Sequence, residues 1–180
     1  DMFCAVGTSI LGYGNDKVNK SVQINIKKGN MTSLNCPEEF YLSKKLIKHH
    51  PWAAMVKFTR GGGEANSVAI RIARSCTKKK NVAFCGYHGW HDWYLSANIN
   101  SKKNLDEHLM SGLNFDGIPE KLKNTSFPFP YNNFKYLSDL VKKKNIGIIK
   151  MEVMRNNEPK DNFLKKIRKI CNEKKIILIF

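Results

Sequence analysis

The chain has 180 residues, of which 42% are hydrophobic and 26% are charged, and its formal net charge is +16 at pH 7. A chain of this size can bury one hydrophobic core, and it contains neither a signal peptide nor the run of about 18 apolar residues that predicts a membrane span. Its five cysteines lack the spacing of a disulfide framework, so we expect reduced thiols and a soluble, cytoplasmic protein.

Nucleic acid is the partner that the positive charge first suggests. However, the 26 lysines outnumber the 5 arginines, are scattered along the chain, and accompany 19 asparagines. No arginine cluster offers the forked hydrogen bonds that read bases or phosphates. Trp90, Trp93 and Tyr94 offer aromatic rings of the kind that stack on bases, but they follow a Tyr-His-Gly segment and are better explained as core or site lining. Nucleic-acid binding is therefore kept only as the alternative function.

A glycine-rich turn is the most informative feature of the first half of the chain. Residues 61–63 are all glycine, and they join an apolar run at 55–58, expected to be a strand, to a helix predicted for 65–77. Three glycines remove every side chain from the turn, so its backbone N–H groups can approach an anion closely. The helix adds unpaired first-turn donors and the positive end of its dipole, so the junction is predicted to bind a phosphate.

The predicted helix carries apolar residues at three- and four-residue spacing. The residues expected to face the core together are Ala65, Val68, Ala69, Ile72, Ala73 and Cys76. Two common nucleotide motifs are excluded here. A Walker A loop needs Lys and then Ser or Thr where this chain has Glu64 and Ala65, and the Gly-x-Gly-x-x-Gly fingerprint is not present. A tight surface turn without a ligand remains the alternative to a phosphate site.

A second candidate segment follows the strand predicted at residues 82–85, where the chain reads Gly-Tyr-His-Gly. Tyr87 is either an aromatic platform for a ligand ring or a core residue. His88 is either a hydrogen-bonding support or an ordinary polar loop residue. Cys85, His88 and His91 have a spacing that could place three metal ligands near one point, but no second cluster completes such a site, so we predict no metal.

Helices and strands are predicted to alternate in the second half of the chain. Residues 100–130 are rich in glycine and proline and are expected to form a surface loop near the site. Buried strands are predicted at 146–153 and 176–180. Helices are expected after Asn132 or Asn133, and after Asp161 or Asn162. Their inward residues are Phe134, Leu137, Leu140, Val141, Phe163, Leu164, Ile167, Ile170 and Cys171. This order predicts an α/β fold with a mostly parallel sheet and ligands at the carboxyl ends of its strands.

These segments together resemble the class III aminotransferases, which use pyridoxal 5'-phosphate. The resemblance rests on the order strand, Gly-Gly-Gly-Glu-Ala turn, helix with Arg-Ile-Ala-Arg, strand, and Gly-Tyr-His-Gly loop. It extends along essentially the whole chain, from Ile-Leu-Gly-Tyr-Gly at 10–14, through Pro-Glu-Glu before a helix at 37–39, to Met-Glu-Val at 151–153. The branch that contains glutamate-1-semialdehyde aminomutase and its aminotransferase relatives is the most similar.

The resemblance implies roles for six residues. In the family, the turn that matches residues 61–63 usually reads Ser-Gly-Thr and binds the cofactor phosphate through its backbone; here Gly63 replaces the threonine, which removes a hydroxyl contact. Tyr87 matches the aromatic residue that stacks on the pyridine ring, and Asn157 matches an asparagine near the ring hydroxyl. The predicted cofactor-binding residues are Gly61, Gly62, Gly63, Tyr87, His88 and Asn157.

The resemblance also implies what lies beyond this sequence. In the family, the strand that matches 176–180 is followed by Asp-Glu, whose aspartate pairs with the pyridinium nitrogen, and the cofactor-binding lysine comes later. We expect both beyond Phe180, so that no catalytic residue lies in this chain and the fragment alone is inactive.

The expected architecture is a partial fold-type I structure, with an N-terminal segment at 1–36 and the first half of the large α/β domain at 37–180. The expected activity of the full-length enzyme is amino-group movement on, or to, a small keto or aldehyde substrate. Its expected partners are a small-molecule amino donor or acceptor and a second copy in a homodimer.

Overall fold

The computed structural model describes residues 2–29, 31, 33–108, 112–154 and 156–180. The chain forms two compact units, Asp1–Lys57 and Phe58–Phe180, and each is described by itself. The predicted domain division after residue 36 rests on the resemblance alone and stays a prediction. Among the described residues, no helix combines the length and apolar character needed to cross a membrane.

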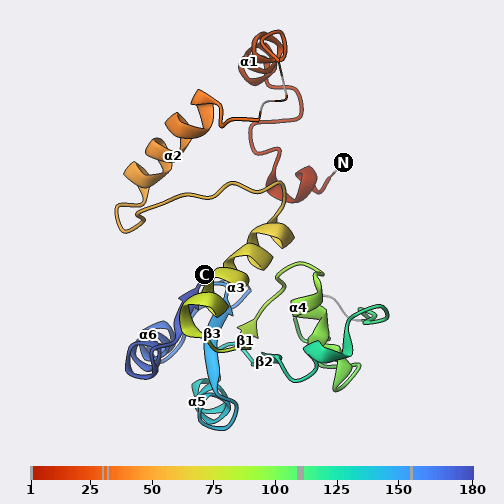
Figure 1. The fold of residues 1–180 in the computed structure, drawn as a ribbon, viewed down its shortest axis with the longest axis vertical. Helices are drawn as coiled ribbons and strands as arrows, with labels where there is room; N and C mark the ends of the chain where they lie inside the picture. Colours follow the sequence, from red (N-terminus) through yellow and green to blue (C-terminus); the bar gives the residue numbers. More distant parts are fainter. Residues whose placement is uncertain (1, 30, 32, 109–111, 155) are drawn as a thin grey trace. The chain divides into compact units, whose positions relative to one another are not determined.

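The first unit consists of helices joined by irregular chain (Figure 1). Its elements are the short 3-10 helix η1 (Cys4–Gly7), α1 (Asp16–Ile26) and α2 (Pro37–His49). The side chain of Asn15 caps α1 by accepting a hydrogen bond from the Val18 N–H at 3.2 Å. Pro37 occupies the start of α2, where the missing N–H costs nothing. The helix expected after Pro37 is thus confirmed, whereas α1 was not predicted.

The second unit is built on a four-stranded parallel sheet. Its strands are β1 (Asn81–Cys85), β2 (Ser126–Pro128), β3 (Ile146–Met151) and β4 (Ile177–Ile179), in the order β2-β1-β3-β4. The predicted α/β class with a parallel sheet is therefore confirmed. The chain leaves β1 toward β2 and then returns to β3 on the other side of β1. The carboxyl ends of β1 and β3 thus form a topological switch point, the usual ligand-binding place of such sheets.

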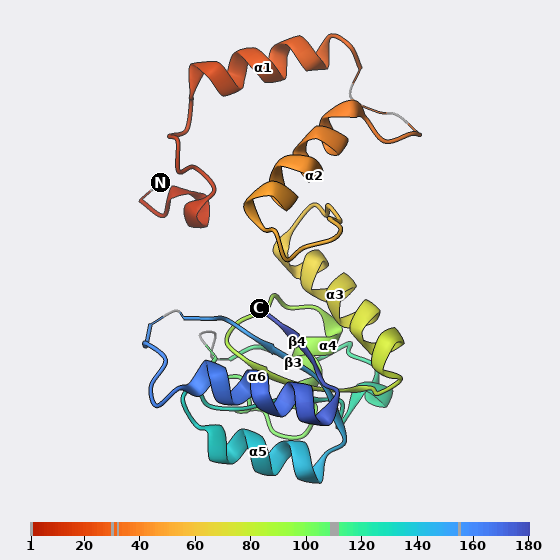
Figure 2. The ribbon, with the colours of Figure 1, turned by 90° about the vertical axis from the view of Figure 1, so that its left-hand side faces the viewer.

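Helices cover both faces of this sheet. They are α3 (Gly62–Thr77), α4 (Asp92–Leu95), α5 (Phe134–Lys143) and α6 (Phe163–Lys174), with the short 3-10 helices η2 (Ser96–Ile99) and η3 (Glu120–Leu122). Figure 2 shows α5 and α6 side by side on one face. Ala83 and Ile149 pack toward these two helices, while Phe84 and Ile148 pack toward α3 and α4 on the other face. Successive strand residues alternate between the two cores, as the pleat requires.

The stripe predicted on α5 is confirmed. Leu137 and Val141 are buried, and Phe134 and Leu140 pack against the same core. Asn133, rather than Asn132, caps the helix, because its side chain accepts a hydrogen bond from the Tyr136 N–H at 2.9 Å.

Replacing Asn133 with alanine is expected to lower the free energy of unfolding by about 1 kcal/mol, because the Tyr136 N–H loses its acceptor. Asn133→Ser restores an oxygen at the cap and should recover most of this loss. Urea unfolding of the complete gene product measures both variants. Equal losses for alanine and serine would show that the cap does not contribute.

Two expectations about strands and one about exposure are wrong. Residues 53–59 have no regular secondary structure, and Met55 is 88% exposed, so the apolar run at 55–58 is not a strand. A strand requires a neighbour for its backbone groups, and no ladder of the described sheet includes this run. β3 ends at Met151, two residues before the expected end. The region 100–130 is not all surface loop, because Leu105 and Phe129 are fully buried and β2 lies within it.

The core-facing side of α3 also differs from the prediction. The helix begins at Gly62, and its buried residues are Ile70 and Ala73. Ala65, Ile72 and Cys76 are exposed. Apolar residues occupy a wide arc of this helix, so periodicity alone does not show which part of the arc meets the sheet.

Candidate functional site

The start of α3 presents an open surface of backbone donors. The first backbone hydrogen bond of the helix runs from Ala65 N to Gly61 O at 3.0 Å, so the N–H groups before Ala65 have no acceptor in the preceding turn. A Cβ added to Gly61 or Gly62 would meet no atom within 4 Å. The Glu64 carboxylate turns back and accepts a hydrogen bond from Arg60 N at 2.9 Å. This geometry leaves space for a ligand directly over the glycine turn.

The helix start and the loop after β1 are fixed against each other by a close backbone approach. A Cβ on Gly89 would lie 2.8 Å from the Cα of Gly63, and one on Gly63 would lie 2.7 Å from the His91 ring. Gly89 also has φ +87°, a conformation that favours glycine. Asn66 adds a hydrogen bond from its Nδ2 to His88 O at 3.1 Å. The two segments therefore behave as one wall of the site.

Five of the six predicted cofactor-binding residues come together in a cavity of about 640 Å³. These five residues are Gly61, Gly62, Gly63, Tyr87 and His88. The Tyr87 ring stands edge-to-face against Tyr94, with centroids 5.8 Å apart. His88 is 3% exposed, and its Nε2 lies 2.8 Å from Cys85 O. The position of the His88 ring favours a supporting role for this residue over direct ligand contact.

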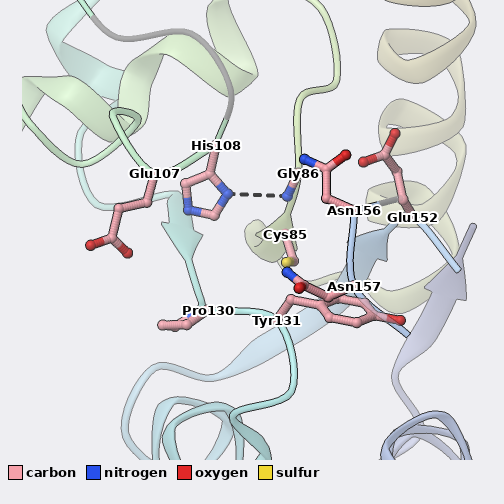
Figure 3. Close-up of a pocket in the computed structure, with 9 residues that line it drawn as sticks. All are labelled: Cys85, Gly86, Glu107, His108, Pro130, Tyr131, Glu152, Asn156 and Asn157. Carbon is pink, nitrogen blue, oxygen red and sulfur yellow. Dashed lines mark hydrogen bonds between the residues drawn. The ribbon is translucent and has the colours of Figure 1, made fainter. Parts of the chain in front are cut away.

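Asn157, the sixth predicted residue, lines a second cavity of about 240 Å³ (Figure 3). This cavity lies at the switch point, between the ends of β1 and β3, and Gly86, Tyr131 and Glu152 also line it. Gly86 belongs to this cavity and the next residue, Tyr87, to the first. The turn after β1 therefore borders both cavities.

The loop that carries Asn157 is held from two sides. The Tyr131 hydroxyl donates a hydrogen bond to Val153 O at 2.5 Å, before Asn157 in the chain. The Asn132 side chain donates to Glu158 O at 2.9 Å and accepts from Lys160 N at 3.0 Å, after it. Asn132, which the sequence offered as a candidate helix cap, instead stabilises this loop through two hydrogen bonds with its backbone.

Four residues that support the site were not predicted to do so from the sequence: Asn66, His108, Tyr131 and Asn132. Tyr94 was expected as core or site lining, and it is fully buried. An asparagine within the otherwise apolar stripe of α3 was the one available signal, because such a side chain needs a polar partner. His108, Tyr131 and Asn132 act through contacts with residues at least 22 positions away in the chain, which leave no local pattern.

Comparison with known proteins decides the family. The sequence profile described as Aminotransferase class-III matches residues 1–180, the whole chain. The chain belongs to the class III aminotransferases. It is 36% identical to the glutamate-1-semialdehyde 2,1-aminomutase of Methanobrevibacter smithii, covering 100% of this chain and 43% of that protein. It is 32% identical to the 3-aminobutyryl-CoA aminotransferase of Cloacimonas acidaminovorans, covering 100% of this chain and 42% of that protein.

The solved structures agree with this class III aminotransferase fold. An omega-transaminase from Sphaerobacter thermophilus matches with a TM-score of 0.83 and 22% identity, over 99% of this chain and 43% of that one. Pyridoxal phosphate is bound in two other solved chains with this fold. The chain therefore spans less than half the length of the curated relatives it matches.

The residues of this class III chain fit the cofactor of the family. The open glycine turn offers backbone donors of the kind that bind phosphate, and Tyr87 places an aromatic ring in the same cavity. Burial, and secondarily the Glu152 charge, raises the pKa of the Cys85 thiol to about 12 and so favours its protonated form. Across the described ranges, no three His, Cys, Asp or Glu side chains gather closely enough to hold a metal.

Proposed function

We propose that the complete gene product is a pyridoxal-phosphate-dependent enzyme that moves an amino group on, or to, a small keto or aldehyde substrate. The observation that carries this proposal is the close contact of Gly63 with Gly89, which places the phosphate-binding turn and the Tyr87 loop in one cavity. The family membership and the aminomutase and aminotransferase relatives support it.

Each residue of the proposed site has a distinct task. The backbone N–H groups of the turn at Gly61, Gly62 and Gly63 bind the phosphate, assisted by the helix dipole. Tyr87 covers one face of the pyridine ring, a contact worth about 1 kcal/mol beyond burial. Asn157 offers its amide to a polar atom at the ring edge. When bound, the cofactor supplies the electron sink that weakens bonds at the amine-bearing carbon.

His88 and Asn66 keep this arrangement in place. His88 binds Cys85 O at the end of β1, and Asn66 ties the following loop to α3. Neither side chain needs to move a proton for this role. We place the lysine that holds the cofactor and the aspartate that pairs with its ring nitrogen outside residues 1–180, following the family pattern.

The same proposal includes a homodimer in the cytoplasm, acting on small molecules. Aminotransferase and aminomutase activities both fit the proposed site, since both require a turn that binds the cofactor phosphate and an aromatic side chain against the pyridine ring. An assay distinguishes them: an aminomutase converts one substrate to its isomer without an added amino acceptor, whereas an aminotransferase requires both a donor and an acceptor.

Absorption titration of the complete gene product with pyridoxal phosphate tests the proposal. We expect a cofactor-dependent visible band, and Tyr87→Ala should weaken binding about fivefold, the equivalent of the lost stacking. Tyr136→Ala is the matched control, because Tyr136 is a half-exposed tyrosine on α5 that lines neither cavity. A wild-type protein without any such band, or equal binding by both variants, would contradict the proposed site. Tight, salt-sensitive retention of nucleic acid would instead favour the alternative function.

A further inference from the structure

Residues 101–108, which follow η2, pack into the molecule beside the turn after β1. Leu105 is fully buried, and its N–H donates to Asn98 Oδ1 at 3.1 Å. The Asn104 side chain donates to Ala97 O at 2.7 Å. These contacts fix the path of residues 101–108 and bring His108, which is 6% exposed, to the end of β1.

His108 binds the backbone of Gly86 directly. Gly86 N donates to His108 Nδ1 at 3.0 Å, the contact drawn in Figure 3. On its other side, Gly86 O accepts from the Tyr94 hydroxyl at 3.3 Å. The His108 ring packs against Phe84, with centroids 5.4 Å apart. Both backbone polar groups of Gly86 are therefore bound by side chains from other segments.

The conformation of the turn at Gly86 favours glycine at this position. Its φ of +97° favours glycine, and an added Cβ would lie 2.7 Å from Glu152 Oε2. Because Nδ1 of His108 accepts the hydrogen bond, the neutral ring carries its proton on Nε2. Burial lowers the pKa of His108, against a smaller opposing effect of Glu107, and so favours this neutral form.

We propose that His108 is a positioning residue for the cofactor ring. By accepting the Gly86 N–H, it sets the direction in which the chain leaves β1, and Tyr87 follows as the next residue. Tyr87 is thus oriented by a loop that lines the second cavity, together with Asn157, and not the cavity over the glycine turn. This inference rests on the proposed function, since it assigns Tyr87 to a pyridoxal phosphate ring.

Three substitutions at His108 test the inference. His108→Asn places an amide oxygen where Nδ1 lies, His108→Gln places it one bond farther away, and His108→Leu has no acceptor. In the complete gene product, we expect the dissociation constant for pyridoxal phosphate to rise about fivefold to tenfold for the leucine and glutamine variants, and by less than twofold for asparagine. The visible circular dichroism of the bound cofactor should differ from that of the wild type in the leucine and glutamine variants. In the asparagine variant it should match the wild type.

Equal affinities and equal dichroism for the asparagine and glutamine variants would overturn the positioning role, and so would wild-type binding by His108→Leu. The comparison of asparagine with glutamine holds even if the leucine variant fails to fold. Hydrogen exchange at the Gly86 amide without cofactor separates this inference from the proposed function. Faster exchange of the Gly86 amide in the His108→Gln variant than in the His108→Asn variant supports the contact with His108. Identical exchange in the two variants overturns the positioning role. A wild-type protein that binds no pyridoxal phosphate contradicts the proposed function whichever exchange result is obtained.

Discussion

Replacing Gly89 with alanine is expected to lower the free energy of unfolding by about 2 kcal/mol or more and to abolish pyridoxal phosphate binding. Two causes act together. Gly89 has φ +87°, which strains any residue with a side chain, and the new Cβ would lie 2.8 Å from the Cα of Gly63. Since the obstructing atom is backbone, no side-chain rotation relieves the clash. The Tyr87 loop must then separate from the helix start, and the cavity loses its shape.

Gly62→Ala is the matched control for this prediction. An added Cβ at Gly62 meets nothing within 4 Å, and alanine is a better helix former than glycine. Its stability should therefore equal or exceed that of the wild type, while the methyl group occupies phosphate space and weakens cofactor binding. Urea unfolding and absorption titration of the complete gene product measure both effects. Similar loss of stability in the two variants would show that the backbone contact does not hold the site together.

The elements that could be predicted are those whose sequences carry one clear pattern of apolar residues. α5 and α6 both carry a single apolar stripe and end in lysines, so their extents and buried faces followed from the sequence. α3 was harder, because apolar residues surround much of it and only packing selects Ile70 over Ile72. β2 has three residues and includes Pro128, which suits an edge strand but weakens any strand pattern.

The candidate site divides in the same way. The glycine turn and the Tyr87 loop were recognisable as parts of a site from their residue types and their order along the chain. The residues that hold these segments in place could not be recognised in the sequence. His108 lies 22 residues from Gly86, and Asn132 lies 26 residues from Glu158. Such contacts depend on the paths of intervening loops, which no periodicity encodes.

A buried lysine near the C-terminal end of β3 is expected to have a large effect on stability. Lys150 is 5% exposed, and its neighbours in the adjoining strands are Phe84 and Ile179. Burial lowers its pKa, and the smaller effect of Glu152 raises it. A buried ammonium group costs free energy unless it is well paired. Lys150→Met keeps an unbranched chain of similar length without the charge, so we expect a gain of about 1–2 kcal/mol in unfolding free energy at neutral pH.

The pH dependence of this gain identifies its cause. Because the pKa of Lys150 in the folded state lies below its ordinary value of 10.5, the unfolded chain binds more protons between these two values. The wild type should therefore gain stability relative to Lys150→Met as pH rises through that window, and the advantage of methionine should shrink.

Lys135→Met, at an exposed site on α5, is the control, and its stability relative to the wild type should not change in this way with pH. Unfolding curves of the complete gene product at about pH 7 and about pH 10 make the comparison. If Lys150→Met is instead less stable than the wild type at neutral pH, the ammonium group is held by an interaction stronger than its burial cost, and Glu152→Gln should then cause a similar loss.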